Sequence, residues 1–233
     1  MRVRTVTTVT TVLGISAVLL TVPACSAGTT GVTPGTASSS VGEPARPGQS
    51  AAPLSSAALE ARLLDEQDLG SGYLRKPERV TRHDDVTVIG CPALNKLGGD
   101  AATGSLAFPR KAKATFTYTG GSSSEVSEEL YSDSANTLSD SIGQIFDAMT
   151  GCPTYQVVAG STVIDLATQK LTAPRRLGDE QWSQLLTFSA GGQSTVVKQT
   201  AIRDGSLLLV VSGAPALVDR HLDKALAKAT AAG

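Results

Sequence analysis

Histidine is almost missing from this sequence, because only two of the 233 residues are histidine. Histidine is the commonest proton carrier near neutral pH and the commonest metal ligand, so its scarcity leaves little room for general-base or metal chemistry. His221 lies in a helical apolar pattern, where a histidine at the boundary of the core is expected. His83 stands before two aspartates, which leaves open a serine hydrolase that uses His83 with an acid and a distant serine. No Gly-x-Ser-x-Gly or Ser-x-x-Lys motif marks such a nucleophile, and a solvated loop is the preferred interpretation.

Aromatic residues are also few, at 4% of the chain, and there is no excess of positive charge. A row of stacking rings of the kind that holds sugars or single-stranded nucleic acid is therefore not expected. Without Arg2 and Arg4, 18 basic residues face 21 acidic ones, a net charge of −3. Nucleic-acid binding needs clustered positive charge, so we expect no nucleic-acid partner. No phosphate-loop, His-Glu-x-x-His or calcium-loop motif occurs, and we expect no cofactor, no metal and no enzymatic activity.

A long hydrophobic run is lacking, but the N-terminus carries an export signal. A basic start is followed by the apolar run Val12 to Leu20, far shorter than the roughly 20 residues of a spanning helix. Residues 1–24 are therefore predicted to be a signal peptide. Its end, Val22-Pro23-Ala24-Cys25, resembles a bacterial lipobox, which implies that Cys25 becomes the acylated first residue of the mature protein. The expected location is then the extracytoplasmic face of the cell membrane, with membrane lipid as a partner through Cys25. The alternative is an ordinary secretory signal that is cleaved nearby.

The cysteine count is small and odd, since Cys25, Cys91 and Cys152 are the three. Lipidation of Cys25 would leave a pair, and outside the cytoplasm Cys91 and Cys152 would be free to form a disulfide. When only the length of the closed loop is considered, such a bridge contributes roughly 4 kcal/mol to the stability of the folded domain. Two buried free thiols are the alternative. A metal site is less favoured, because the sequence has no Cys-x-x-Cys or His-x-x-His spacing.

The rest of the chain divides into a linker and one domain. Residues 25–54 are predicted to form a lipidated, disordered tether, since almost all of them are Ser, Ala, Gly, Thr or Pro and cannot pack. Residues 55–230 are predicted to fold as a single extracytoplasmic α+β domain, an antiparallel β-sheet with packed helices. The expected helices run from Ser55 or Ser56 to Gly70, from Pro92 to Gly98, from Ser132 or Asp133 to Gly151, and from Pro215 onward. The expected strands are 85–90, 111–119, 124–131, 154–159, 162–168, 182–188, 195–203 and 207–211.

The order of these elements resembles actinobacterial envelope lipoproteins with a PknH-like extracellular sensor domain, over about residues 58–230. The residues that carry the resemblance are Leu63-Leu64, Asp68-Leu69, Gly72-Tyr73, the two Cys-Pro steps, the strand Leu207 to Val211 and the last helix. The resemblance implies an exported α+β domain that senses or binds something in the cell envelope. This chain has no kinase segment and only one pair of cysteines for a disulfide, where the kinase-attached sensor has more.

Three functions therefore remain open. The first is a non-enzymatic lipoprotein whose domain binds an unknown envelope ligand or protein, with Tyr73 and Trp182 as candidate ligand contacts. Trp182 alternates with Leu186 and Phe188 along a predicted strand, so a place in the core is its simpler interpretation. The second is a structural or accessory lipoprotein that docks to an envelope complex, and the third is the hydrolase that uses His83. An exposed apolar patch would favour docking, and a deep pocket would favour ligand binding.

Overall fold

The computed structural model describes residues 52–78, 86–98, 101, 106–120 and 124–231. The chain divides into two units between Pro44 and Ala45, and all of the described residues belong to the second. Cys25, the predicted signal peptide, nearly all of the tether and His83 lie outside the described residues. Within these ranges, no helix is long and apolar enough to span a membrane.

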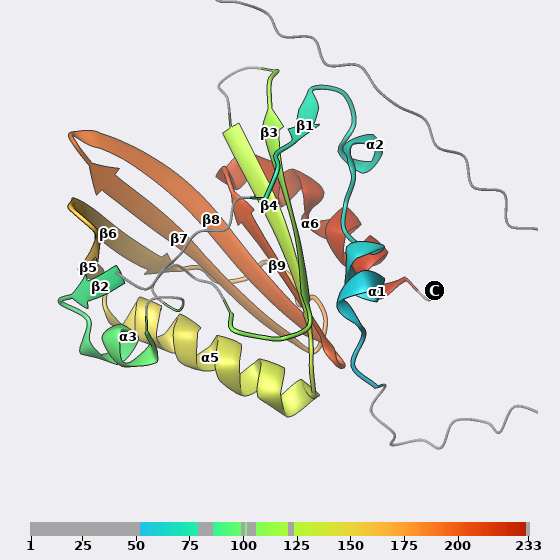
Figure 1. Cartoon of the computed structure of the whole chain (residues 1–233), viewed down its shortest axis with the longest axis horizontal. Coiled ribbons are helices and arrows are strands. Elements are labelled where there is room, and N and C mark those ends of the chain that lie inside the picture. Colours follow the sequence, from blue (N-terminus) through green and yellow to red (C-terminus); the bar gives the residue numbers. More distant parts are fainter. Residues whose placement is uncertain (1–51, 79–85, 99–100, 102–105, 121–123, 232–233) are drawn as a thin grey trace, which may run out of the picture. The chain divides into compact units, whose positions relative to one another are not determined.

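Nine strands of the described residues form one sheet in which every neighbouring pair is antiparallel (Figure 1). The order across the sheet is β1-β3-β4-β9-β8-β7-β6-β5-β2, so the two N-terminal strands lie at opposite edges. The strands are β1 (Tyr73–Arg75), β2 (Val86–Ile89), β3 (Lys111–Tyr118), β4 (Ser124–Ser132), β5 (Thr154–Ala159), β6 (Thr162–Lys170), β7 (Glu180–Ala190), β8 (Gln193–Asp204) and β9 (Leu207–Gly213).

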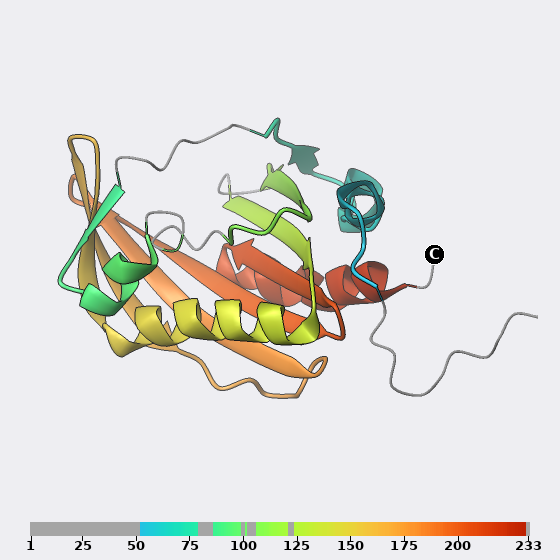
Figure 2. The same cartoon turned by 60° about the horizontal axis from the view of Figure 1, so that its bottom comes forward.

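Helices pack on both faces of the sheet (Figure 1 and Figure 2). On one face, α1 (Ser56–Glu60), α2 (Glu66–Leu69) and α6 (Pro215–Thr230) share a core cluster with the end of the sheet formed by β1, β3, β4 and β9. On the other face lie α3 (Pro92–Leu97) and α5 (Ala135–Gly151). In β9, Leu209 belongs to the first cluster while Leu208 and Val210 belong to the α5 cluster. The apolar run of β9 is therefore buried on both faces, and the predicted α+β fold with an antiparallel sheet is confirmed.

Local sequence signals place several element ends as predicted. Ser55 caps α1, because its hydroxyl accepts a hydrogen bond from the Ala58 N–H at 3.2 Å. Pro92 and Pro215 occupy the first turns of α3 and α6, where the missing N–H has no cost. Gly191 and Gly192 connect β7 to β8 with φ values of 57° and 78°, the left-handed conformation that a two-residue hairpin turn needs.

Two predicted boundaries are wrong. The first predicted helix is two helices, because Asp65 caps a new helix: its carboxylate accepts from the Asp68 N–H, and the Asp68 carboxylate accepts from the Asp65 N–H. The cap of α5 is Ser134 rather than Ser132 or Asp133. Ser132 is the last residue of β4, and its hydroxyl donates to the Ser206 carbonyl and accepts from the Leu54 N–H.

Cys91 and Cys152 form the predicted disulfide, with an S–S distance of 2.07 Å. Cys91 precedes α3, and Cys152 follows the last residue of α5. The bridge therefore ties the start of one helix to the end of the other. Both sulfur-bearing residues belong to a core cluster that also includes Leu94, Met149 and Val157.

Candidate functional site: the open half of the sheet

The face of the sheet that carries α6 is covered over only part of its width. α6 packs on β4, β8 and β9, and the same face continues beyond them through β7, β6, β5 and β2. Strand pairing places Ile89, Gln156 and Asp165 side by side on this face, whereas the neighbouring Tyr155 and Leu166 point into the core beneath α5. We call this uncovered surface the open face. Its apolar residues are Ile89, Val158, Val163, Ala167, Leu185 and Val196.

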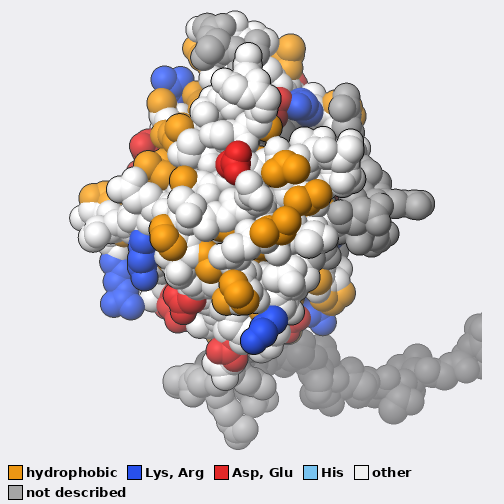
Figure 3. All heavy atoms as spheres, turned by 90° about the vertical axis from the view of Figure 1, so that its left-hand side faces the viewer, with side chains coloured by type: hydrophobic (Ala, Val, Ile, Leu, Met, Phe, Trp, Pro, Cys, Tyr) orange, Lys and Arg blue, Asp and Glu red, His pale blue; other side chains and the backbone are white. Residues whose placement is uncertain are grey.

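The open face holds three of the five large hydrophobic side chains that are exposed among the described residues. Ile89 is 51% exposed, Val163 49% and Val196 44%, and the other two, Leu74 and Leu97, lie on β1 and α3. Figure 3 views the molecule from the side at which β2, β5 and β6 lie in Figure 1, and hydrophobic side chains form a band there with few charged ones among them. Clustering of exposed apolar side chains is the kind of feature that marks an interaction surface.

A groove of about 450 Å³ runs over the open face, and it is wide open to solvent. Among the described residues that line it, Asp165 is the one that carries a charge. The Asp165 Oδ1 accepts a hydrogen bond of 2.8 Å from the Gln156 Nε2, and the side chain is exposed. The remaining lining is apolar, amide or hydroxyl in character, from residues such as Ile89, Thr187 and Ser189. Such a surface suits an apolar partner surface that brings one positive charge.

Tyr73, one of the two predicted ligand contacts, is buried at the other end of the sheet. Its hydroxyl shares a 2.6 Å hydrogen bond with the His221 Nε2, and the centroid of its ring lies 4.8 Å from that of Tyr118. Burial, with a smaller contribution from the neighbouring Arg220 and Lys224, lowers the pKa of His221, which keeps the imidazole neutral near pH 7. His221 therefore acts as a hydrogen-bonded core residue, buried more deeply than the expected boundary position.

Trp182, the other predicted ligand contact, is half-buried on the α5 side of the sheet. It packs against the cluster that contains Leu138 and Leu208, in agreement with its place in the core pattern. Neither Tyr73 nor Trp182 belongs to the lining of the groove described above. Ligand binding by these two residues stays a prediction, as do the roles of Cys25 and His83 outside the described ranges.

Sequence reasoning missed a buried carboxylate, that of Glu128. Glu128 is 2% exposed on β4, between the core residues Val126 and Leu130. Its Oε2 accepts a 2.7 Å hydrogen bond from the Leu64 N–H, whereas its Oε1 has no hydrogen-bond partner among the described residues. Alternation along the strand could have revealed it, because Glu128 occupies the same face as two apolar neighbours.

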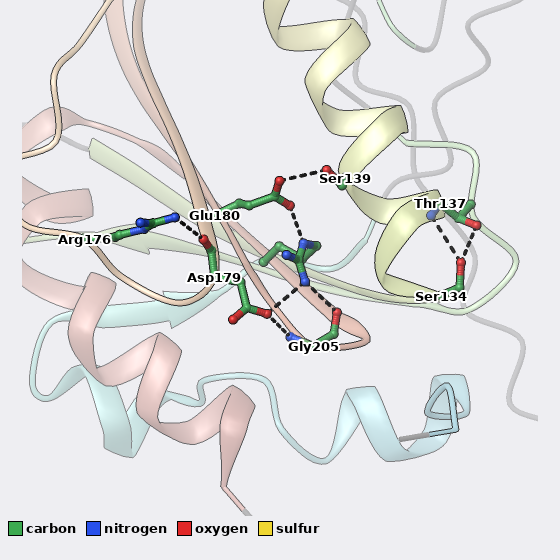
Figure 4. A network of polar contacts seen from close by, with 8 residues as sticks. Ser134, Thr137, Ser139, Arg176, Asp179, Glu180 and Gly205 are labelled. Carbon is green, nitrogen blue, oxygen red and sulfur yellow. Dashed lines mark hydrogen bonds and ion pairs between the residues drawn. The ribbon is translucent and has the colours of Figure 1, made fainter. Parts of the chain in front are cut away.

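A second missed feature is the ion-pair network around Arg203 (Figure 4). The Arg203 guanidinium bonds to the carboxylates of Asp179 and Glu180, and it donates to the Gly205 carbonyl at 3.1 Å. Glu180 also accepts from the Ser139 hydroxyl at 2.9 Å, which connects the network to α5. The hydrogen bond from Arg203 lowers the pKa of Glu180. This network connects the start of β7, the turn between β8 and β9, and α5, so its role is structural.

Comparison with known proteins gives a fold but no family. No protein-family model matches the chain, and no curated protein matches it. Among solved structures, the extracellular domain of PknH from Mycobacterium tuberculosis is similar with a TM-score of 0.57 and 13% identity, covering 76% of this chain and 97% of that one. An uncharacterized protein from Mycobacterium smegmatis has a TM-score of 0.38 and 9% identity, covering 70% of this chain and 91% of that one. The chain thus shares its fold with the extracellular domain of PknH.

Proposed function

We propose that this chain is a non-enzymatic, extracytoplasmic binding domain, anchored in a membrane by lipid on Cys25, and that it binds a partner protein through the open face. The observation that carries the binding proposal is the exposure of Ile89, Val163 and Val196 on one uncovered face of the sheet. Exposed apolar side chains that gather on one face are a mark of interaction surfaces, and here they stand among polar residues such as Gln156 and Thr187.

The shape of the open face favours a protein over a small molecule. A small-molecule site encloses most of its ligand, whereas this groove is wide open and the exposed side chains are spread over β2, β6 and β8. Asp165 is the charged group of the lining, so the partner should place a lysine or arginine against it. An anionic membrane surface is disfavoured as the occupant, because the described residues of the lining include no cation.

The proposed location is supported by several independent features. Val22 to Cys25 has the pattern of a lipidation site, and the remaining two cysteines are paired, as is common outside the cytoplasm. The PknH domain that shares this fold is extracellular. In the proposed arrangement, residues 1–24 are removed, residues 25–54 form a flexible tether, and residues 55–230 form the binding domain. A tether of this kind lets the open face reach a partner protein in the envelope.

Site-specific crosslinking in intact cells tests the proposed surface. A photoreactive benzoyl-phenylalanine replaces Val163 on the open face or, as a matched control, Leu74, which is 59% exposed on β1 at the opposite edge of the sheet. We expect a discrete protein adduct from position 163 and none from position 74. The adduct should disappear with Asp165→Lys, since that change replaces attraction of a cation by repulsion.

Three outcomes would contradict the proposal. They are equal crosslinking from both positions, no protein adduct at position 163, and an adduct that Asp165→Lys does not affect. Native mass spectrometry of the purified protein covers the small-molecule case: a retained small molecule that Val163→Asp removes would show that the open face is a ligand site.

A further inference from the structure

The N-terminal segment Leu54–Leu69, which we call the clasp segment, is held against the sheet and against α6 at several separate points. The Leu54 N–H donates to the Ser132 hydroxyl at 2.8 Å, and the Arg62 guanidinium donates to the Ala229 carbonyl at 2.9 Å. Its side chains Leu59, Leu63, Leu64 and Leu69 are buried in the same cluster as α6. The clasp segment follows the predicted tether directly and precedes β1.

The central polar contact of the clasp segment is the hydrogen bond between the Leu64 N–H and Glu128. Glu128 lies on β4, and the residues opposite it on the two neighbouring strands are Ala114 and Val211, so its surroundings within the sheet are apolar. One carboxylate oxygen accepts from the Leu64 N–H, and the other has no hydrogen-bond partner within the part of the chain that the structure describes. A buried, ionised carboxylate with one hydrogen bond is costly, because the water that it loses is not replaced.

Lys228 acts on Glu128 through its charge but makes its hydrogen bonds elsewhere. Lys228 of α6 bonds instead to the carboxylates of Asp65 and Asp68. Lys228 lowers the pKa of Glu128 and Asp68 of α2 raises it, so these two effects oppose each other. Burial is the largest cause and raises the pKa of Glu128 from 4.5 to about 7, although the Leu64 hydrogen bond and Lys228 both act to lower it. The carboxyl group therefore changes its charge near neutral pH while it is buried under the clasp segment.

We propose that Glu128 makes the clasp segment a pH-responsive element, which is held closed while Glu128 carries a proton and loosens when Glu128 ionises. The neutral acid can still accept the Leu64 N–H through its carbonyl oxygen, without the cost of a buried charge. The ionised group regains water only if Leu64 lifts away from β4. The open form thus has a carboxyl group near its ordinary pKa of 4.5, whereas in the closed form the pKa is about 7.

The direction of the effect follows from the numbers of bound protons. Between these two pKa values the closed form binds more protons than the open form, so opening becomes more favourable as pH rises through this window. The difference of about 2.5 pKa units sets a limit of about 300-fold on the increase in the opening equilibrium constant. Between pH 6 and pH 8 the same relation gives an increase of about tenfold.

Hydrogen exchange of the backbone amides tests this proposal in the purified protein. The exchange rates of Leu64 and Leu69, divided by their intrinsic rates at each pH, should report an opening constant that rises about tenfold from pH 6 to pH 8. Glu128→Gln should abolish the rise, because glutamine keeps an acceptor for the Leu64 N–H and has no charge. Glu129→Gln is the matched control: Glu129 is the next residue on β4, bonds to Lys113, and should leave the rise intact.

His221 must be separated from this effect, since it is a buried residue of α6 and its lowered pKa gives pH dependence of the opposite sign. The difference between the wild type and Glu128→Gln cancels its contribution. If Glu128→Gln fails to fold, titration of the Glu128 side-chain carboxyl carbon by NMR in the wild type decides the matter. A midpoint near 4.5, an opening constant that does not change with pH, or an unchanged rise in Glu128→Gln would overturn the proposal.

Discussion

Removal of the disulfide should lower the stability of the domain by a large fraction. In the double variant Cys91→Ala/Cys152→Ala, the unfolded chain regains the freedom of a loop that the bridge closes over a sequence separation of 61 residues. The chain-entropy model gives about 4 kcal/mol for a loop of this length. The free energy of unfolding of ordinary domains is about 5–15 kcal/mol, so the variant should remain folded but with only a small free energy of unfolding left.

Urea unfolding of the oxidised protein, followed by circular dichroism and by the fluorescence of the one tryptophan, Trp182, measures this loss. The wild type in reducing agent is the matched control and should unfold like the variant. Hydrogen exchange should show the largest gain in local opening at α3 and the last turn of α5, which the bridge ties together. A loss below about 1 kcal/mol would refute the loop-entropy argument. Stoichiometric labelling of two thiols in the denatured, unreduced protein would show instead that the bridge does not form.

Three further predictions concern the ion-pair network, the buried histidine and the anchor. Arg203→Met should lower the free energy of unfolding by about 1–2 kcal/mol, a value between those for exposed and buried ion pairs, because the Arg203 side chain is 12% exposed but its partners are more accessible. As a control, Arg175→Met removes an exposed ion pair and should lower it by less than about 0.5 kcal/mol in the same urea titration. Equal losses in the two variants would contradict the argument from burial. Tyr73→Phe should cost about 1 kcal/mol because it removes the hydrogen bond to the buried His221, and an unchanged urea midpoint would count against that bond. Cys25→Ala should release the protein from membranes or block its maturation, and unchanged membrane retention in cell fractions would argue against lipid anchoring.

Much of the fold was predictable because its signals are local. The Gly191-Gly192 turn, the prolines that begin α3 and α6, and the cap at Ser55 each depend on residues within one turn of chain. The unbroken apolar run of β9 predicted burial on both faces, since an alternating pattern would have left one face polar. The cap of α5 was missed because Ser132 and Ser134 are both good caps, and a hydrogen bond to the Ser206 carbonyl, in the turn between β8 and β9, occupies Ser132.

The candidate site depended on contacts that the sequence does not encode locally. Alternation in β5 and β6 predicts that each strand has two different faces, but it does not say which face a helix will cover. α6 covers one half of the sheet because β9 and β8 lie beside β4, and the other half stays open because β2 joins at the far edge, beside β5. The open face is therefore a consequence of strand order.

By itself, the sequence predicted that the two remaining cysteines can pair, and it predicted most of the helices and most of the strands, since these follow from parity, local chemistry and periodicity. The export signal that it also predicts lies outside the described residues and stays a prediction. Only the tertiary structure decided that Glu128 lies under Leu64, that Tyr73 meets His221 across 148 residues, and that one half of the sheet is left uncovered. The physical reason is that a side-chain pattern records whether a residue prefers water or the core. It does not record which distant segment excludes the water.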